Sequence, residues 1–124
     1  MKLTKNINRT EVACRCGCGQ DSIDYAVIQA VQGACDYFAE KLGKSKVILH
    51  INSGNRCEKH NAKVGGGDKS QHLLGKAIDH YIEDVTIREL FNYYAKKYPH
   101  TFGKSPYYAD GFVHLDSRDH SATW

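Results

Sequence analysis

The sequence predicts an α+β domain in which a small, mainly antiparallel sheet is flanked by helices. Apolar residues recur at helical spacing in two long segments, and short segments rich in β-branched residues lie between and after them. Near the C-terminus an Asp-Gly pair stands between two aromatic and β-branched arms, which is a strong hairpin signal. The predicted order is helix, strand, loop, strand, helix and hairpin. Because 124 residues is a usual length for one domain, we expect residues 1–124 to form a single domain.

The first helix is predicted from residue 23 to residue 42. Either Asp21 or Ser22 is suited to cap its start, Asp24 lies in its first turn, and Gly43 is a natural stop. The apolar residues that give this segment its helical period are Ile23, Val27, Ala30, Val31, Ala34, Phe38 and Leu42. This is the longest predicted helix, and we expect it to form much of the core.

The other predicted elements are shorter. Residues 46–52, "KVILHIN", and residues 77–82, "AIDHYI", are predicted as strands, and the glycine-rich residues 64–69 as a flexible loop. A second helix is expected within residues 84–99, which have a polar start, apolar residues at helical spacing, late lysines and a terminating proline. The hairpin is expected over residues 106–118, "PYYADGFVHLDSR".

The charge and hydropathy of the chain favour some partners over others. A net charge of +3 and an isoelectric point of about 8.6 weakly favour an anionic partner such as a cell wall, but no dense stripe of Lys and Arg suggests nucleic acid. No segment approaches the ~20 apolar residues of a membrane span, and the polar N-terminal segment lacks the apolar run of a signal peptide. We therefore expect a soluble monomer without nucleic-acid or membrane partners.

Three of the five cysteines, Cys14, Cys16 and Cys18, lie close together in "ACRCGCG". The odd number of cysteines and the missing secretion signal argue against a disulfide framework. The C-x-C-x-C spacing also differs from the C-x2-C pairs that are usual in zinc fingers. Two interpretations stay open: a tight turn that carries reduced thiols, or a metal or redox role.

The segment "KSQHLLGKAIDHY" carries the first two candidate metal ligands, His72 and Asp79. In one continuous helix the two would lie roughly 10 Å apart along the axis, too far for both to reach a single ion at about 2 Å. The glycines at 67 and 75 also disfavour a helix. If His72 closes a loop, Gly75 turns the chain and Asp79 lies on the following strand, the two side chains can converge. A hydrogen-bonded structural pair is the alternative.

The third candidate ligand is His114 in "FVHLDSR". On a strand, Phe112, His114 and Asp116 share one face, while the residues between them face the apolar core. Two histidines and one carboxylate, with a fourth position left for water, form a ligand set that is typical of catalytic zinc. Structural zinc would more often have four ligands rich in Cys.

Three segments resemble the zinc D-alanyl-D-alanine peptidases of the M15 type, in the right order and over about half of the chain: "SGNR" at 53–56, "SQHLLGKAID" at 70–79 and "FVHLD" at 112–116. The family pattern is S-G-x-R, S-x-H-x-x-G-x-A-x-D and a late histidine on a strand. The resemblance implies a Hedgehog/DD-peptidase-like fold and one zinc ion per chain, bound by His72, Asp79 and His114.

The resemblance also implies that Arg56 and Ser70 contact the substrate. A bidentate guanidinium at Arg56 suits a substrate carboxylate or a developing oxyanion. The hydroxyl of Ser70 can bond the substrate backbone or cap the loop, and Gln71 either contacts the substrate or shapes the loop. Gly75 and Ala77 are interpreted as small packing positions.

The general base does not follow from the family pattern. Some members carry an acid three residues before the last histidine and others a histidine two before it, but those positions are Gly111 and Phe112 here. Asp116 and Asp110 remain as candidates. Asp116 is nearer to His114, at roughly 7 Å along a strand, whereas Asp110 is roughly 13 Å away in the predicted turn. Asp116 is the favoured base, with an orienting role for its carboxylate as the alternative.

These observations together predict a zinc peptidase that cuts peptidoglycan stem peptides or cross-links as a D,D-carboxypeptidase or endopeptidase. A mildly basic chain without a signal suits a phage endolysin, which moves from the host cytoplasm to the cell wall. Two alternatives stay open: a cytoplasmic D-Ala-D-Ala dipeptidase, and a non-catalytic, zinc-containing module that binds the cell wall.

Overall fold

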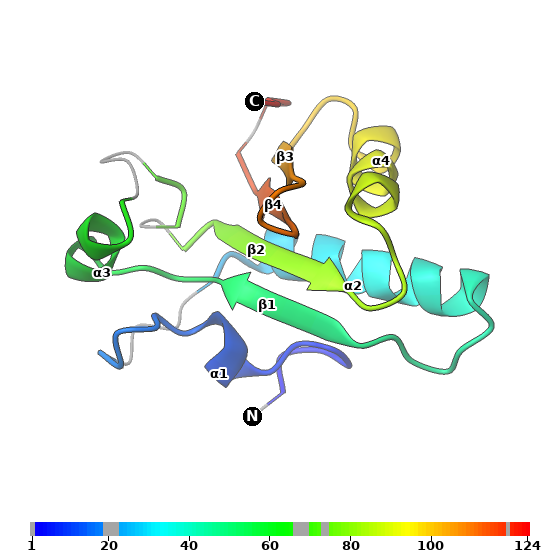
Figure 1. The fold of residues 1–124 in the computed structure, drawn as a ribbon, viewed down its shortest axis with the longest axis horizontal. Coiled ribbons are helices and arrows are strands. Elements are labelled where there is room, and N and C mark those ends of the chain that lie inside the picture. Colours follow the sequence, from blue (N-terminus) through cyan, green and yellow to red (C-terminus); the bar gives the residue numbers. More distant parts are fainter. Residues whose placement is uncertain (1, 19–22, 66–69, 73–74, 119) are drawn as a thin grey trace.

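The structure is a computed structural model that describes residues 2–18, 23–65, 70–72, 75–118 and 120–124 (Figure 1). The chain forms four helices and four strands within these residues, and it has the predicted α+β class. The elements in chain order are α1 (Arg9–Val12), α2 (Tyr25–Lys41), β1 (Leu49–Ser53), α3 (Glu58–Lys63), β2 (Ala77–Ile82), α4 (Ile87–Lys97), β3 (Gly103–Tyr107) and β4 (Phe112–Asp116).

The strands form one antiparallel sheet in the order β1-β2-β4-β3. Strand β2 lies inside the sheet, so its residues have a neighbour on each side. Asp79 of β2 pairs with Ser53 of β1 and with His114 of β4. This register brings the start of "SGNR", the "AID" segment and the late histidine side by side on neighbouring strands.

Helix α2 runs along one face of the sheet, and α4 lies beside β3 and β4 (Figure 1). Asp24 caps α2 by accepting a hydrogen bond from the backbone N–H of Ala26. The sequence pattern predicts Asp24 within the first turn, whereas the residue lies just before that turn. The other two predicted caps, Asp21 and Ser22, lie outside the described residues. Gly43 ends the helix as predicted, because its φ of +68° is a left-handed conformation that glycine adopts at little cost.

The core lies between the sheet and the two long helices. Tyr94 of α4 and Phe38 of α2 are the largest side chains in it, and both are almost completely buried. Helix α4 is shorter than the predicted segment because Thr86 and Glu89 form a capping box that fixes its first turn at Ile87. No helix among the described residues has the length and apolar content that crossing a membrane requires.

The prediction of the first strand needs correction at both ends. Strand β1 begins at Leu49 instead of residue 46, and it ends at Ser53, one residue beyond the predicted end. The register shifts between Ile51 and Ser53, which allows Ser53 to pair with Asp79 despite the irregular end of the strand. Strand β2 has the predicted bounds.

The predicted hairpin is present, but its connection has four residues, 108–111, instead of an Asp-Gly pair alone. Gly111 has a φ of +78°, as a turn glycine should. Helix α1 was not predicted; its cap is Asn8, which forms a capping box with Glu11. Of the loop predicted over 64–69, residues 66–69 lie outside the described residues.

Candidate metal centre

His72 is held with its Nε2 atom facing the centre of the site. Its Nδ1 donates a hydrogen bond of 2.7 Å to the carbonyl oxygen of Gly54, the residue that directly follows β1. Gly75, with a φ of +66°, returns the chain toward β2 and donates its N–H to the carbonyl of His72. The turn predicted from the sequence is therefore present. Because Nδ1 carries the proton, the Nε2 lone pair is available to a ligand.

Asp79 and His114 reach the same point from neighbouring strands. Asp79 Oδ1 is 2.8 Å from His114 Nδ1, and Asp79 Oδ2 is 3.0 Å from His72 Nε2. All three side chains are buried. The structure therefore brings together the three residues that the sequence predicted as metal ligands.

Asp116 orients His114 from the far side of the ring. The ring donates from Nε2 to Asp116 Oδ2 at 2.9 Å, which leaves Nδ1 facing Asp79. Arg118 forms a bidentate pair with the same carboxylate, at 2.7 and 2.6 Å, and the N–H of Gly103 donates to it at 3.1 Å. Asp116 is completely buried and has donors on both oxygens.

The protonation of the two carboxylates follows from these contacts. Burial alone would raise the pKa of Asp79, but its hydrogen bond with His114 and the closeness of His72 hold it well below its usual range. Burial would likewise raise the pKa of Asp116, but hydrogen bonds from His114 and Arg118 hold it well below its usual range. Both carboxylates are therefore ionised at neutral pH.

The three side chains fit a zinc ion. His72 Nε2 is buried without a hydrogen-bond partner, because its approach to Asp79 lacks hydrogen-bond geometry. The ligand atoms of the three residues all lie within 4.8 Å of one another. Zinc binds imidazole nitrogen and carboxylate oxygen at about 2.0–2.2 Å, so ligand atoms around one ion are roughly 3–4 Å apart. The ring nitrogen of each histidine that faces away from the centre donates a hydrogen bond, to Gly54 or to Asp116, as is usual for metal-binding histidines.

Arg56 lies next to this cluster with its guanidinium held in place. Its Nε donates to Ser53 Oγ at 3.1 Å and its Nη1 to Asn61 Oδ1 at 3.3 Å, while Nη2 is 3.6 Å from Asp79 Oδ2. Its backbone N–H also donates to the carbonyl of His72. The guanidinium of Arg56 is thus anchored to the protein beside the three candidate ligands.

A pocket of about 370 Å³ opens over the cluster. The predicted residues Ser70 and Gln71 line it, although Ser70 Oγ also accepts the N–H of His72 and so caps the loop. The other lining residues are Arg56, Val64, Gly65, His72, Asp79, Tyr107, Phe112, His114, Arg118 and Trp124. A larger hollow of about 780 Å³ between α2 and α4 contains none of the candidate ligands.

The two candidate general bases are placed differently. Asp110 lies in the exposed connection between β3 and β4 and does not line the pocket. Asp116 is adjacent to His114 but has no contact with solvent. His80, on the same strand as Asp79, is fully buried, with Nε2 2.7 Å from the hydroxyl of Tyr94.

Sequence reasoning missed the residues that support the ligands. Gly54 acts through its backbone carbonyl, which no side-chain pattern reveals. Arg118 was within reach of sequence analysis, because it follows Asp116 by two residues and therefore lies on the same side of an extended chain. Trp124 packs edge-on against His114, with 4.9 Å between the centres of the two rings, and its indole N–H donates to the hydroxyl of Tyr107.

Three convergent candidate ligands lie beneath an open pocket on an antiparallel α+β scaffold, an arrangement that suits a metal centre. A family model described as peptidase M15 matches residues 5–116, which is most of the chain. The chain therefore belongs to the M15 peptidases, a family of metallopeptidases that typically depend on zinc. No curated protein and no solved structure matches it.

Proposed function

We propose that the protein is a zinc peptidase that hydrolyses amide bonds in peptidoglycan stem peptides or their cross-links, as a D,D-carboxypeptidase or endopeptidase. The observation that supports this most strongly is the convergence of His72 Nε2, Asp79 and His114 Nδ1 in an M15 chain. We further propose a Hedgehog/DD-peptidase-like arrangement of the sheet and the role of a phage endolysin, which acts on the cell wall.

The proposed ligands are His72, Asp79 and His114, and they bind one zinc ion at this site. A zinc ion held there would supply a Lewis acid that activates water and polarises the scissile carbonyl. The protein itself fixes the orientation of both imidazole rings, since Gly54 and Asp116 determine which nitrogen of each ring faces the centre of the site. Trp124 shields one edge of His114 and limits its access to water.

Arg56 is proposed to bind a substrate carboxylate or the oxygen that becomes negative during amide hydrolysis. Stem peptides carry carboxylates, and a guanidinium that is already anchored loses little further freedom when it binds one. Ser53 and Asn61 provide that anchoring. Ser70 and Gln71, on the rim of the same pocket, are proposed to contact the peptide backbone.

We assign Asp116 to the positioning of His114 instead of to proton transfer. A general base must reach the proton that it removes, whereas Asp116 is buried behind the imidazole. Arg118 and Gly103 already donate to its carboxylate, which keeps it ionised and fixed. Asp110 is assigned no catalytic role, because it lies outside the pocket.

Cleavage of purified cell walls tests the proposed function. The protein should lower the turbidity of a peptidoglycan suspension, and mass spectrometry should find cut stem peptides or cross-links. A chelator should abolish the cleavage and added zinc should restore it, with His72→Ala as an inactive control. Cleavage of free D-Ala-D-Ala alone would instead indicate a dipeptidase. Binding to the walls without cleavage would indicate a non-catalytic module.

A further inference from the structure

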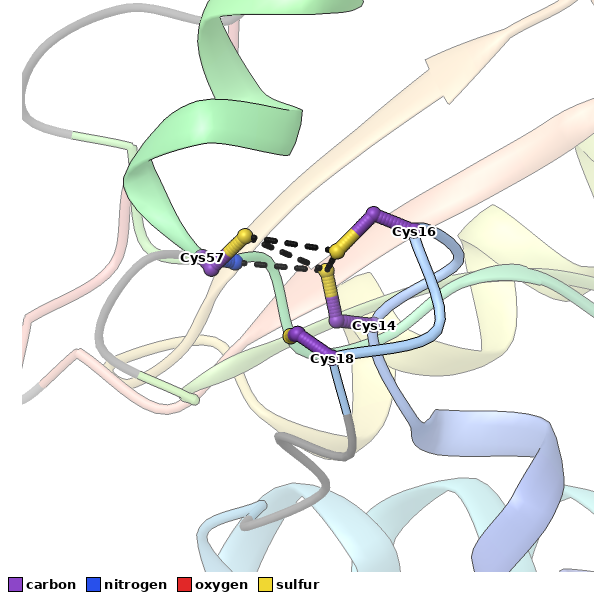
Figure 2. A group of neighbouring side chains, drawn as sticks. All are labelled: Cys14, Cys16, Cys18 and Cys57. Atoms are coloured by element: carbon purple, nitrogen blue, oxygen red, sulfur yellow. Dashed lines mark hydrogen bonds between the residues drawn. The ribbon is translucent and has the colours of Figure 1, made fainter.

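A second cluster of metal-binding side chains lies outside the proposed active site. Cys14, Cys16 and Cys18 come from the segment that follows α1, and Cys57 comes from the residue that precedes α3 (Figure 2). The fourth cysteine is 39 residues or more from the others in sequence, so only the fold brings it to the C-x-C-x-C segment. The fifth, Cys35, is buried in α2 and takes no part.

The four sulfur atoms converge on one point. Sγ of Cys14 is 3.5 Å from Sγ of Cys16 and 3.7 Å from Sγ of Cys57, and the last two are 3.6 Å apart. Sγ of Cys18 completes a set in which all four atoms lie within 4.8 Å of one another. Four thiolates that each bind one zinc at about 2.3 Å are about 3.8 Å apart, whereas disulfide sulfurs are only about 2.0 Å apart.

Backbone groups donate to two of these sulfurs. The N–H of Cys57 points to Sγ of Cys14 at 3.4 Å, as Figure 2 shows, and the N–H of His60 points to Sγ of Cys57 at 3.5 Å. Such donors favour the negatively charged thiolate, which is the form that binds a metal. Outer hydrogen bonds of this kind also orient the ligands of metal sites.

We propose that Cys14, Cys16, Cys18 and Cys57 bind a structural zinc ion, distinct from the ion of the proposed active site. Four soft thiolates at tetrahedral spacing suit zinc and leave no position for water, so the site has a structural role and no catalytic one. The protein would then hold two zinc ions per chain, one more than the sequence predicted.

The proposed ion would also steady the active site. Cys57 directly follows Arg56, and the N–H of Asn55 donates to the carbonyl of Val12 at 2.8 Å. The same N-terminal segment packs so closely on Gly54 that an added Cβ would lie 2.5 Å from the carbonyl oxygen of Val12. A zinc ion that joins residues 14–18 to Cys57 would therefore restrict the movement of residues 54–56, which include Gly54, the partner of His72, and Arg56 itself.

Elemental analysis of purified variants tests the second site. The wild-type protein should contain two zinc ions per chain, whereas Cys16→Ser and Cys57→Ser should each contain one. Cys35→Ser is the matched control, because it removes a cysteine outside the cluster, and it should keep both ions. Full zinc content in Cys16→Ser and Cys57→Ser would overturn the proposal, as would iron in place of zinc or a disulfide among the four cysteines.

A measurement on the unmutated protein covers the case in which these variants fail to fold. Cobalt(II) that replaces zinc among four thiolates absorbs strongly in the near ultraviolet through sulfur-to-metal charge transfer. Cobalt bound by histidine and carboxylate alone does not. The substituted wild-type and His72→Ala proteins should show this absorption at equal strength, and its absence from the wild type would overturn the proposal.

Discussion

At the scale of single residues, what the site can bind depends on which ring nitrogen of each histidine faces the centre of the site. The motif spacings allowed the three candidate ligands His72, Asp79 and His114 to be predicted from sequence. They did not reveal that Nε2 of the first histidine and Nδ1 of the second face the centre, because that choice depends on Gly54 and Asp116. Gly54 comes from another part of the chain, and although Asp116 lies on the same strand as His114, the sequence alone left its role open between base and orienting partner.

Replacing Asp116 by Asn should weaken zinc binding at this site. The variant loses the negative charge that receives His114 Nε2–H and pairs with Arg118, and loss of such an outer partner typically lowers metal affinity 10- to 100-fold. Competition with a chelator of known affinity measures the change, and Asp110→Asn should bind zinc as the wild type does. Unchanged affinity with a large drop in kcat would show that Asp116 is the base after all.

Replacing Arg56 by Lys should reduce catalytic efficiency without removing zinc. Lysine keeps the positive charge but lacks the paired N–H donors of the guanidinium, so at least one charge-assisted hydrogen bond to the substrate is lost. Such a bond contributes about 1.5–3 kcal/mol. We therefore expect kcat/KM to fall about 10- to 100-fold for stem peptides with a free carboxylate. A peptide in which that carboxylate is amidated serves as the control, and wild type and variant should cleave it similarly. Equal efficiency on the free carboxylate would contradict the proposed role.

At the scale of elements, the two long helices α2 and α4, strand β2 and the hairpin could be predicted because each has a clear local signal. Helix α1 has only four residues and no apolar period, so its capping box was the sole clue. The end of β1 at Ser53 depends on an irregular pairing with β2 that no local pattern encodes. The approach of Cys57 to the N-terminal cysteines is likewise a product of the whole fold.

Strand β3 contributes a close packing position whose mutation we can predict. A Cβ on Gly103 would lie 2.4 Å from Asp116 Oδ2 and 2.4 Å from Arg118 Nε. Gly103→Ala should therefore displace the pair that orients His114 and lower the free energy of unfolding by about 1–3 kcal/mol.

The matched control lies in helix α2. A Cβ on Gly33 would meet only the Tyr93 hydroxyl at an ordinary 3.5 Å, and alanine favours a helix, so Gly33→Ala should raise the free energy of unfolding by about 0.5–1 kcal/mol. Denaturant unfolding measures both variants. A Gly103→Ala protein as stable as the wild type would show that β3 does not constrain Asp116.

At the scale of the whole molecule, stability should depend on pH through the buried His80. Burial lowers the pKa of His80 from its ordinary value of 6.5 to about 4. Between these values the unfolded chain binds the proton more readily than the folded chain does, so stability is lost as the pH falls from about 6.5 to 4. The slope contributed by one such group is at most about 1.4 kcal/mol per pH unit.

Unfolding of metal-free wild-type protein and of His80→Gln at several pH values isolates this contribution. The stability advantage of the wild type should shrink as the pH falls below about 6.5. His100→Gln replaces an exposed histidine, and its stability should run parallel to that of the wild type. Parallel curves for the wild type and His80→Gln would contradict the assignment of His80 as a buried neutral residue.

The zinc content of His72→Ala tests the central claim most directly. If His72, Asp79 and His114 bind the catalytic ion, the purified variant should contain one zinc ion fewer per chain than the wild type and should not cleave cell-wall peptides. Circular dichroism should confirm that the variant is folded. A folded His72→Ala protein that retains the full zinc content of the wild type would contradict the account.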